Sequence, residues 1–266
     1  MNRDWTVSKP LDPAELADQL RALGVETGGV LLVHSSYRAV RPIDGGPLGL
    51  IEGLSRALGP EGTLVMPSGT GDDDAPFDSA RTTADPVLGV TADIFWQQPG
   101  ARRSDHPFAC AARGPQAQAI TADPIVFPPS QPASPVGRVH ELDGQILLLG
   151  VGHDSNTTLH LAELLAGVPY RRPKHVTLLQ DGRAVRCDYG ENDHCCQRFV
   201  LADDWLRARG LQNEGPVGYG QARLMRSRDL VAVTREQLAS DPLLFLHAKG
   251  GGCDECEDAW RSVGGL

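Results

Sequence analysis

A histidine and a glutamate in the stretch "SNTTLHLAELLAG" have the residue types and the spacing that proton-transfer chemistry requires. His160 and Glu163 are three positions apart within an apolar run typical of a buried helix, so their side chains lie on neighbouring parts of one helical face. A carboxylate beside an imidazole fixes the tautomer of the ring and stabilises the imidazolium that forms when the ring accepts a proton. The spacing alone is compatible with a structural contact as well as with a catalytic base.

Two cysteines near the C-terminus form a metal-binding pattern. Cys253 and Cys256 make a C-x-x-C, the spacing with which two thiolates bind one tetrahedral zinc ion; reduced thiols and redox activity are the alternatives. Four protein ligands would leave no open position for catalysis, so this zinc would be structural. It would link the C-terminal tail to the helix expected to start near Asp193, and so stabilise the C-terminal part of the chain, about residues 187–266. The other two ligands would come from His194, Cys195, Cys196 and His247, of which we expect Cys196 and His247.

Two acidic clusters lie in predicted loops. The aspartates at 72–74 occur in "GDDDAPFD", and Glu191 and Asp193 occur in "YGENDHCC", where a hairpin is expected to meet a helix. Turns and helix caps commonly contain such residues, so each cluster alone has an ordinary structural explanation. If both converge near His160, they would form an anionic cup suited to a polycation.

These residues fall where buried strands are expected to end. Apolar runs at 28–36, 62–68 and 144–152 predict three strands, each followed by small or polar residues ("VHSS", "MPSGTG" and "GVGHDSN"). Helices expected at 11–25 and 46–62 alternate with them, which is typical of a parallel or mixed sheet covered by helices. Ligands collect beyond the carboxyl ends of such strands, so we expect a common binding rim. Neither G-x-G-x-x-G after the first strand nor G-x-x-x-x-G-K-[ST] occurs, which disfavours the usual nucleotide sites.

The whole chain, residues 1–266, predicts one α/β domain with a mixed central sheet flanked by helices. The segment from 69 to 138 is rich in Pro, Asp, Ser and Gly, so we expect a long functional loop with one helical patch at "TADIFWQQP". The remaining predicted elements are a hairpin at 175–189 with its turn at Asp181-Gly182, a helix at 193–210, and a strand followed by a helix in "RDLVAVTREQLASDPLLFL".

Composition and charge disfavour nucleic acid and membrane as partners. The 266 residues are 41% hydrophobic and carry a net charge of −9, which disfavours a nucleic-acid partner and is compatible with a cationic ligand. We expect no membrane partner because no apolar run is long enough to cross a bilayer. The first residues lack the apolar region of a signal peptide, so a cytoplasmic location is expected. The oligomeric state stays open, with a homodimer as one option.

Several motifs together resemble the aminoglycoside 3-N-acetyltransferases. They are "GGVLLVHSSYRAVRPIDGGPLGLIEGLSRALGPEGTLVMPS", "RRSDHPFACAARGP", "SPVGRVHELDGQILLLGVGHDSNTTLHLAE" and "ENDHCC", spread over roughly residues 24 to 200. The C-terminal "FLHAKGGGCDECEDA" resembles the branch that acts on apramycin as well as on gentamicin-type drugs. The resemblance implies that family's own α/β fold and transfer of acetyl from acetyl-CoA to the 3-amine of a 2-deoxystreptamine ring.

The resemblance also implies roles for individual residues. The histidine of "TTLHLAE", His160, would be the general base for direct attack in a ternary complex, and Glu163 is our candidate for orienting it. Asp73, Glu191 and Asp193 match positions expected to bind the ammonium groups of the drug. The segments that resemble acetyl-CoA contacts contain His34, Ser35, Ser36, Arg103, Ser104, His106 and Phe108.

Two other functions fit the same residues. One is an acetyltransferase of this fold that acts on a different amine, such as a phosphonate or peptide antibiotic. The other is a zinc-stabilised protein that sequesters cationic ligands without chemistry. The acidic clusters favour a polycationic aminoglycoside, of the apramycin, gentamicin or tobramycin class, as the substrate of an enzyme that confers antibiotic resistance.

Overall fold

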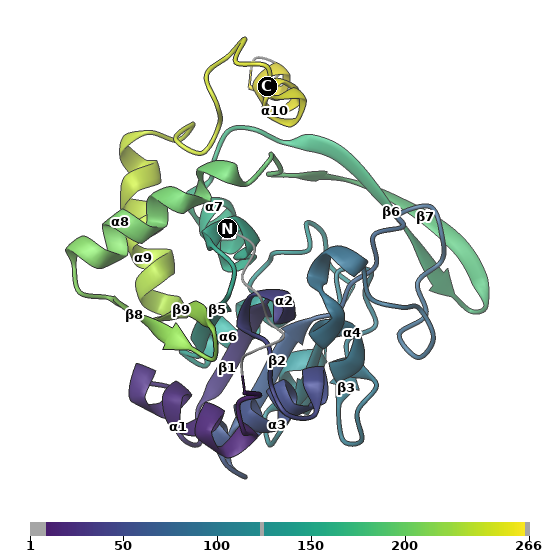
Figure 1. The fold of residues 1–266 in the computed structure, drawn as a ribbon. Helices are drawn as coiled ribbons and strands as arrows, with labels where there is room; N and C mark the ends of the chain where they lie inside the picture. The colour runs from purple at the N-terminus through teal and green to yellow at the C-terminus, as the bar shows by residue number, and fades with distance from the viewer. Residues whose placement is uncertain (1–8, 123–124, 264–266) are drawn as a thin grey trace.

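Three parallel strands form the centre of a mixed sheet, and antiparallel strands extend it on both sides. The computed structural model describes residues 9–122 and 125–263. The prediction that the chain starts without a leader concerns residues 1–8, which lie outside the described residues. The strand arrangement confirms the prediction of a mixed α/β sheet (Figure 1). From edge to edge the strands are β3 (Arg102–Arg103), β4 (Cys110–Arg113), β2 (Thr63–Pro67), β1 (Val30–Ser35), β5 (Gln145–Leu149), β9 (Gly220–Arg226) and β8 (Gln212–Val217).

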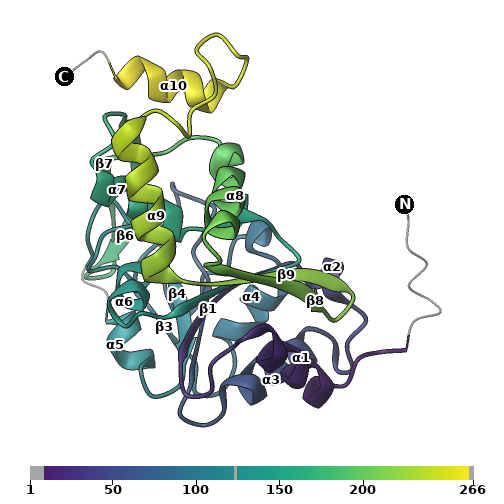
Figure 2. The same cartoon turned by 90° about the vertical axis from the view of Figure 1, so that its left-hand side faces the viewer.

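Alternating side chains of the central strands build two hydrophobic layers, because successive residues of a strand point to opposite faces. Leu31 and Val33 of β1 pack on the face covered by α1 and α3, whereas Leu32 between them packs on the other face. Figures 1 and 2 show the two helical layers on either side of the sheet. The covering helices are α1 (Pro13–Leu23), α3 (Gly46–Leu58) and α4 (Val90–Trp96) on one face, and α5 (Ala117–Thr121), α6 (Pro135–Glu141), α7 (Thr158–Ala166) and α9 (Ser227–Ser240) on the other.

The predicted helix at 11–25 is α1, and its ends show why it forms there. The side chain of Asp12 accepts a hydrogen bond from the backbone N–H of Ala14 at 2.7 Å, and Pro13 occupies the first position. Gly24 ends the helix in the left-handed region at φ 116°, which glycine adopts readily. Leu16 and Leu20, one turn apart, bury the inner face.

The predicted long loop at 69–138 contains more structure than the sequence indicates. Besides α4, this segment forms β3, β4, α5, α6 and the short 3-10 helix η1 (Pro86–Leu88). These elements are too short for hydrophobic periodicity to detect. A local signal exists for α6, because Ser134 followed by Pro135 makes a helix start, and the Ser134 hydroxyl accepts from the N–H of Gly137 at 3.2 Å.

Two elements near the C-terminus differ from prediction. The strand expected at the start of "RDLVAVTREQLASDPLLFL" is wrong: these residues belong to α9, and the strand β9 precedes them. A short apolar run such as "LVAV" fits a buried helix as well as a strand. The helix predicted at 193–210 begins later, as the 3-10 helix η3 (Gln197–Val200) followed by α8 (Leu201–Ala208). Two further helices are α2 (Tyr37–Val40) and α10 (Asp254–Ser262).

A two-stranded hairpin stands apart from the main sheet and arches over one end of the molecule (Figure 1). Its strands are β6 (Arg172–Gln180) and β7 (Arg183–Glu191), and its turn is at Asp181 and Gly182, as predicted. Both turn residues have positive φ, which is the geometry that a two-residue hairpin turn requires. The backbone N–H of Phe77 bonds to the carbonyl of Thr177, so the aspartate loop lies against β6.

Among the described helices, none combines the length and the apolarity that a membrane span needs.

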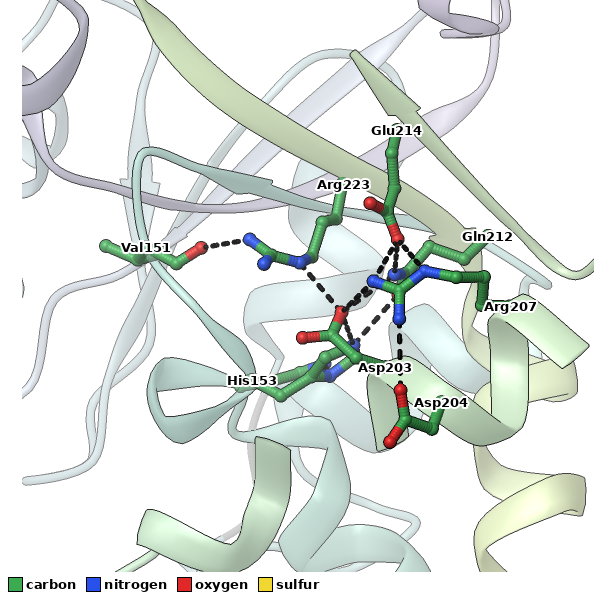
Figure 3. Close-up of polar contacts among 9 residues, drawn as sticks. Val151, His153, Asp203, Asp204, Arg207, Gln212, Glu214 and Arg223 are labelled. Carbon is green, nitrogen blue, oxygen red and sulfur yellow. Dashed lines mark hydrogen bonds and ion pairs between the residues drawn. The ribbon is translucent and has the colours of Figure 1, made fainter. Parts of the chain in front are cut away.

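A buried polar network joins the strand-end rim to α8 and to the β8–β9 edge (Figure 3). The carboxylate of Asp203 accepts from Arg223 Nε at 2.7 Å and from Gln212 Nε2 at 2.8 Å. His153, in the 3-10 helix η2 (His153–Ser155) that follows β5, lies against Gln212 Oε1 at 2.9 Å. Arg223 also donates to the Val151 carbonyl. Asp203 therefore holds the loop that leads into α7.

Replacing Asp203 with alanine should lower the free energy of unfolding by about 1.5–3 kcal/mol, because Arg223 loses its charged partner in a partly buried site. The neighbouring Asp204 is exposed, and among the described residues its ion pair is with Arg207 of the same helix. Asp204→Ala should therefore change the free energy of unfolding by less than about 0.5 kcal/mol. Urea unfolding of the two variants measures the difference, and equal losses would show that the network contributes no special stability.

Candidate active site at helix α7

The imidazole of His160 and the carboxylate of Glu163 meet on α7 as their spacing predicts. His160 Nδ1 lies 2.8 Å from Glu163 Oε2. The histidine side chain is 18% exposed, whereas the glutamate is completely buried. Asn156, just before the helix, accepts from the N–H of its first residue, Thr158, at 3.2 Å. The helix thus presents one titratable ring at the surface with a charged group behind it.

The Glu163 carboxylate is held by four side chains. His160 and His194 each lie 2.8 Å from one oxygen, the Tyr170 hydroxyl donates to Oε1, and Asn192 Nδ2 donates to Oε2 at 3.4 Å. Burial alone would raise the pKa of this carboxyl, but the hydrogen bonds from His160 and His194 outweigh burial and lower the pKa to about 2. Glu163 is therefore an anion throughout the neutral pH range.

The hydrogen bonds also determine which ring nitrogens carry protons. His194 Nδ1 accepts from the backbone N–H of Cys196 at 3.0 Å, so its Nε2 carries the proton donated to Glu163. Ionised Glu163 can only accept, so Nδ1 of His160 carries a proton as well. When His160 is neutral, its Nε2 consequently holds a lone pair. Cys196 Sγ is 3.4 Å from this nitrogen.

Two opposing effects set the pKa of His160. Burial lowers it, while the sulfur of Cys196 and the carboxylate of Glu163 stabilise the imidazolium and raise the pKa well above its usual value. A ring with a fixed tautomer and raised proton affinity can remove a proton from a neighbouring group. The geometry therefore favours a base over a purely structural contact.

Two of the predicted drug-binding carboxylates lie in environments that favour a cation. Glu191 at the end of β7 is 7% exposed, and burial raises its pKa to about 6 despite the opposing charge of His160. Asp73 lies against β6, where its carbonyl accepts from Thr177 Oγ1 at 2.9 Å. Burial raises the pKa of Asp73 as well, and Lys174 and His175 oppose this. A ligand ammonium would stabilise both carboxylates.

Asp193, the third predicted drug-binding carboxylate, already has partners. Arg172 Nη1 is 2.6 Å and Lys174 Nζ 3.0 Å from Asp193 Oδ2, and both cations come from β6. Arg172 also pairs with Asp258 of α10 at 3.1 Å. The charge of Asp193 is thus balanced by the protein itself. The hairpin register creates this pairing, which sequence spacing did not reveal.

The predicted binding rim contains a cavity beyond the ends of β1, β2 and β5. Its volume is about 230 Å³, and His34, Ser35, Met66, Pro67, Asp154 and Ser155 are among the residues that line it. His34 is buried, and its Nε2 has no hydrogen-bond partner within the described chain. Burial, together with the charge of His153, lowers the pKa of His34 to about 4, so the ring is neutral near pH 7. His34 and Ser35 are therefore available to a ligand.

The second segment predicted to contact acetyl-CoA is mostly engaged within the protein. Arg103 donates to the carbonyls of Ser68 and Thr82, and its guanidinium lies 4.3 Å from the ring centroid of Trp96. It therefore fixes the loop after β2 rather than facing a phosphate. Ser104 and His106 are buried and accept backbone N–H groups of Cys110 and Phe108; of the four residues predicted here, only Phe108 has a well-exposed side chain.

The donor atoms of four side chains lie within 4.8 Å of one another: Cys195, His247, Cys253 and Cys256. Cys195 Sγ is 3.7 Å from Cys256 Sγ and 4.0 Å from His247 Nδ1. A tetrahedral zinc with bonds of about 2.3 Å to sulfur would place two sulfurs about 3.8 Å apart, so the donor set fits this ion.

The cluster differs from the predicted ligand set at one residue. The cluster contains Cys195, whereas Cys196 lies against His160. Cys196 has a positive φ of 59°, a conformation that residues other than glycine, asparagine and aspartate seldom adopt. Two adjacent cysteines give no local signal that favours Cys195 over Cys196 as a ligand.

The site also contains residues with no role predicted from the sequence: Tyr170 and Asn192, together with His194 and Cys196 in their contacts to Glu163 and His160. The motif "ENDHCC" places three of them together and was a usable signal. Tyr170 had none, because its contact arises only when the chain turns back after α7.

The chain is similar to proteins of one family over most of its length. A family model described as aminoglycoside 3-N-acetyltransferase matches residues 32–239. Aminoglycoside N(3)-acetyltransferase IV of Salmonella sp is 65% identical over 239 residues, which cover 90% of this chain and 92% of that protein. Aminoglycoside N(3)-acetyltransferase VII of Streptomyces paromomycinus is 31% identical over 258 residues, with 84% and 89% covered.

Solved structures with the same fold include complexes with ligands. The fold matches aminoglycoside acetyltransferase AAC(3)-IVa, in a histidine-to-alanine variant bound to a gentamicin, with a TM-score of 0.95, 62% identity, and 97% and 99% of the two chains covered. The apramycin complex of the same variant matches with a TM-score of 0.88, 60% identity, and 94% and 99% covered. AAC-IIIb bound to coenzyme A matches with a TM-score of 0.79 at 25% identity, with 87% and 97% covered. On this sequence and structural similarity, the chain belongs to the aminoglycoside 3-N-acetyltransferase family.

Proposed function

We propose that this protein transfers the acetyl group of acetyl-CoA to the 3-amino group of 2-deoxystreptamine aminoglycosides of the apramycin, gentamicin and tobramycin class, and so confers resistance to them. The observation that carries the proposal is the His160–Glu163 pair. Glu163, held as an anion by its four partners, fixes a proton on Nδ1 of His160 and leaves Nε2 as the base. The family membership supplies the reaction class.

The reaction needs a neutral amine, because an ammonium nitrogen has no lone pair, so the ammonium proton is first lost to solvent. In the ternary complex the nitrogen of the neutral 3-amine attacks the thioester carbonyl, and Nε2 of His160 removes the proton that this nitrogen must lose as the amide forms. The new N–C bond forms, the C–S bond breaks, and the proton held by His160 neutralises the departing thiolate of coenzyme A. Glu163 stabilises the imidazolium in between. A cationic drug beside His160 would favour the neutral ring, which offsets its raised pKa in the free protein.

Glu191 and Asp73 bind drug ammonium groups in this scheme, since both carboxylates lie in partly desolvated positions. Asp193 acts indirectly, because it balances the charges of Arg172 and Lys174, which would otherwise repel a polycation. His34 and Ser35 at the rim cavity contact acetyl-CoA. The reaction takes place in the cytoplasm, where acetyl-CoA is available and where the six cysteines stay reduced.

We further propose that Cys195, His247, Cys253 and Cys256 hold one structural zinc ion. The donor set is typical of closed structural sites, and four protein ligands leave no position for substrate. Bound zinc would join the turn at 193–196 to the first turn of α10 and the segment before it. It supplies no step of the transfer.

Replacing His160 with alanine should lower kcat by roughly two to four orders of magnitude, because the amine loses its base, while apramycin still binds. A thiol assay for coenzyme A release, with apramycin and acetyl-CoA, measures turnover, and calorimetry measures binding.

Glu163→Gln should lower kcat to a similar extent, because the amide would donate to Nδ1 of His160 and place the ring proton on Nε2. His140→Ala on α6 is the remote control. Near-normal turnover of His160→Ala would remove His160 as the base, and drug binding without any thiol release by the native protein would favour sequestration.

Drug affinity should weaken as the pH falls through about 6, since protonated Glu191 cannot pair with an ammonium. With a pKa of about 6, roughly one Glu191 in ten is ionised at pH 5 in the free protein. Calorimetric titration with apramycin from pH 5 to 7.5 tests this, and Glu191→Gln should bind more weakly and lose most of the pH dependence. A Glu191→Gln variant with the native pH profile would show that Glu191 does not face the drug.

Elemental analysis of protein purified without a metal-affinity tag should find about one zinc per chain. Cys253→Ser and Cys195→Ser should each lose the metal and lower the unfolding midpoint, while Cys196→Ser and Cys187→Ser keep it. Retention of zinc by Cys195→Ser together with its loss from Cys196→Ser would restore the ligand set predicted from sequence. Metal-free native protein with readily alkylated Cys253 and Cys256 would exclude the zinc site.

A further inference from the structure

Cys196 lies at the base nitrogen, and neither the transfer scheme nor the zinc cluster explains its role. Its sulfur lies 3.4 Å from Nε2 of His160 and 3.4 Å from the carbonyl oxygen of His194. The thiol is therefore placed between two acceptors. One of them is the lone pair that the proposed reaction uses.

The backbone holds the thiol in this position. Cys196 has a φ of 59°, a conformation that residues with a Cβ seldom adopt, and its N–H donates to His194 Nδ1 at 3.0 Å. The same histidine donates to Glu163. The thiol and the carboxylate are thus positioned through one buried ring, on opposite sides of the base.

A thiol in this position can satisfy both protonation states of His160, because it has one hydrogen to donate and a sulfur that accepts weakly. Beside the neutral ring, S–H donates to Nε2. Beside the imidazolium, Nε2–H donates to sulfur while S–H turns to the carbonyl of His194. The change requires only rotation about the Cβ–Sγ bond.

We propose that Cys196 is a positioning residue for His160: its thiol holds Nε2 of the neutral ring and releases the lone pair to the incoming amine by turning its S–H to the carbonyl of His194. The inference rests on the proposed function of His160. Because a thiol is a weak donor, the amine replaces it easily. The aligned acceptor sulfur remains at the ring when the proton arrives.

Other groups around His160 do not duplicate this contact. Glu163 of α7 bonds to Nδ1, and His194 bonds to Glu163 rather than to the base. Glu191 of β7 interacts with His160 by charge, without a hydrogen bond between them in the described structure. The edge of the His160 ring meets the apolar ring of Phe199 in η3, at 5.0 Å between centroids.

The test compares Cys196→Ala and Cys196→Ser with the native protein over a pH series, at equal zinc content. Alanine should lower kcat by about 10- to 100-fold with little change in the KM for apramycin, because the ring loses its alignment. It should also move the acid limb of kcat/KM to lower pH, since the imidazolium loses an acceptor. Serine, which can also turn between the two acceptors, should restore the position of the limb. Cys187→Ala on β7 is the cysteine control.

Superimposable pH profiles for the native protein and Cys196→Ala would overturn the inference. It would also be overturned if Cys196→Ala lost activity together with a lower unfolding midpoint and Cys196→Ser did not restore the activity. Failure of the proposed function gives a different result: the native protein would then release no coenzyme A, or His160→Ala would remain active.

Discussion

The buried carboxylate of Glu163 is the constraint around which the site is built. An ionised carboxylate removed from water is strongly unfavourable unless hydrogen bonds replace its hydration. The four donors here come from α7, from the chain just after it, and from the end of the hairpin and the turn beyond. The carboxylate can be buried only when all of these segments have assembled. One charge thus couples the formation of the base to the docking of the hairpin.

The sheet supplies the rigid frame for that assembly. The parallel strands β1 and β5 end side by side, and Ser36 N–H bonds to the Leu149 carbonyl just beyond them. Gly150 follows at φ 72°, and a Cβ there would lie 2.6 Å from that of Ala39 in α2. The chain can therefore turn sharply into η2 and α7 without a clash. The network at Asp203 then fixes this turn from the opposite side (Figure 3).

Local sequence rules predicted those parts of the structure that depend on local contacts. The start and end of α1, the central strands, the hairpin turn and the contact between His160 and Glu163 all follow from spacing within a few residues. What these rules missed includes the start of α9, where a strand was expected, and contacts between residues distant in sequence. Asp193 meets Arg172 only through the hairpin register, and Arg103 bonds to the Ser68 carbonyl across the loop. Neither contact leaves a periodic signal.

The adjacent cysteines show how one backbone angle can divide two functions. Cys195 faces Cys256 and His247, whereas Cys196, whose φ is positive, faces the base. The turn between β7 and η3 therefore lies between the metal-type cluster and His160. The segment before α10 is far from α7 in sequence, yet it packs against the turn that carries His194. A displacement of that segment would be transmitted to Glu163 through a single residue, His194. The C-terminal segment therefore supports the active site, although it contributes no reacting atom.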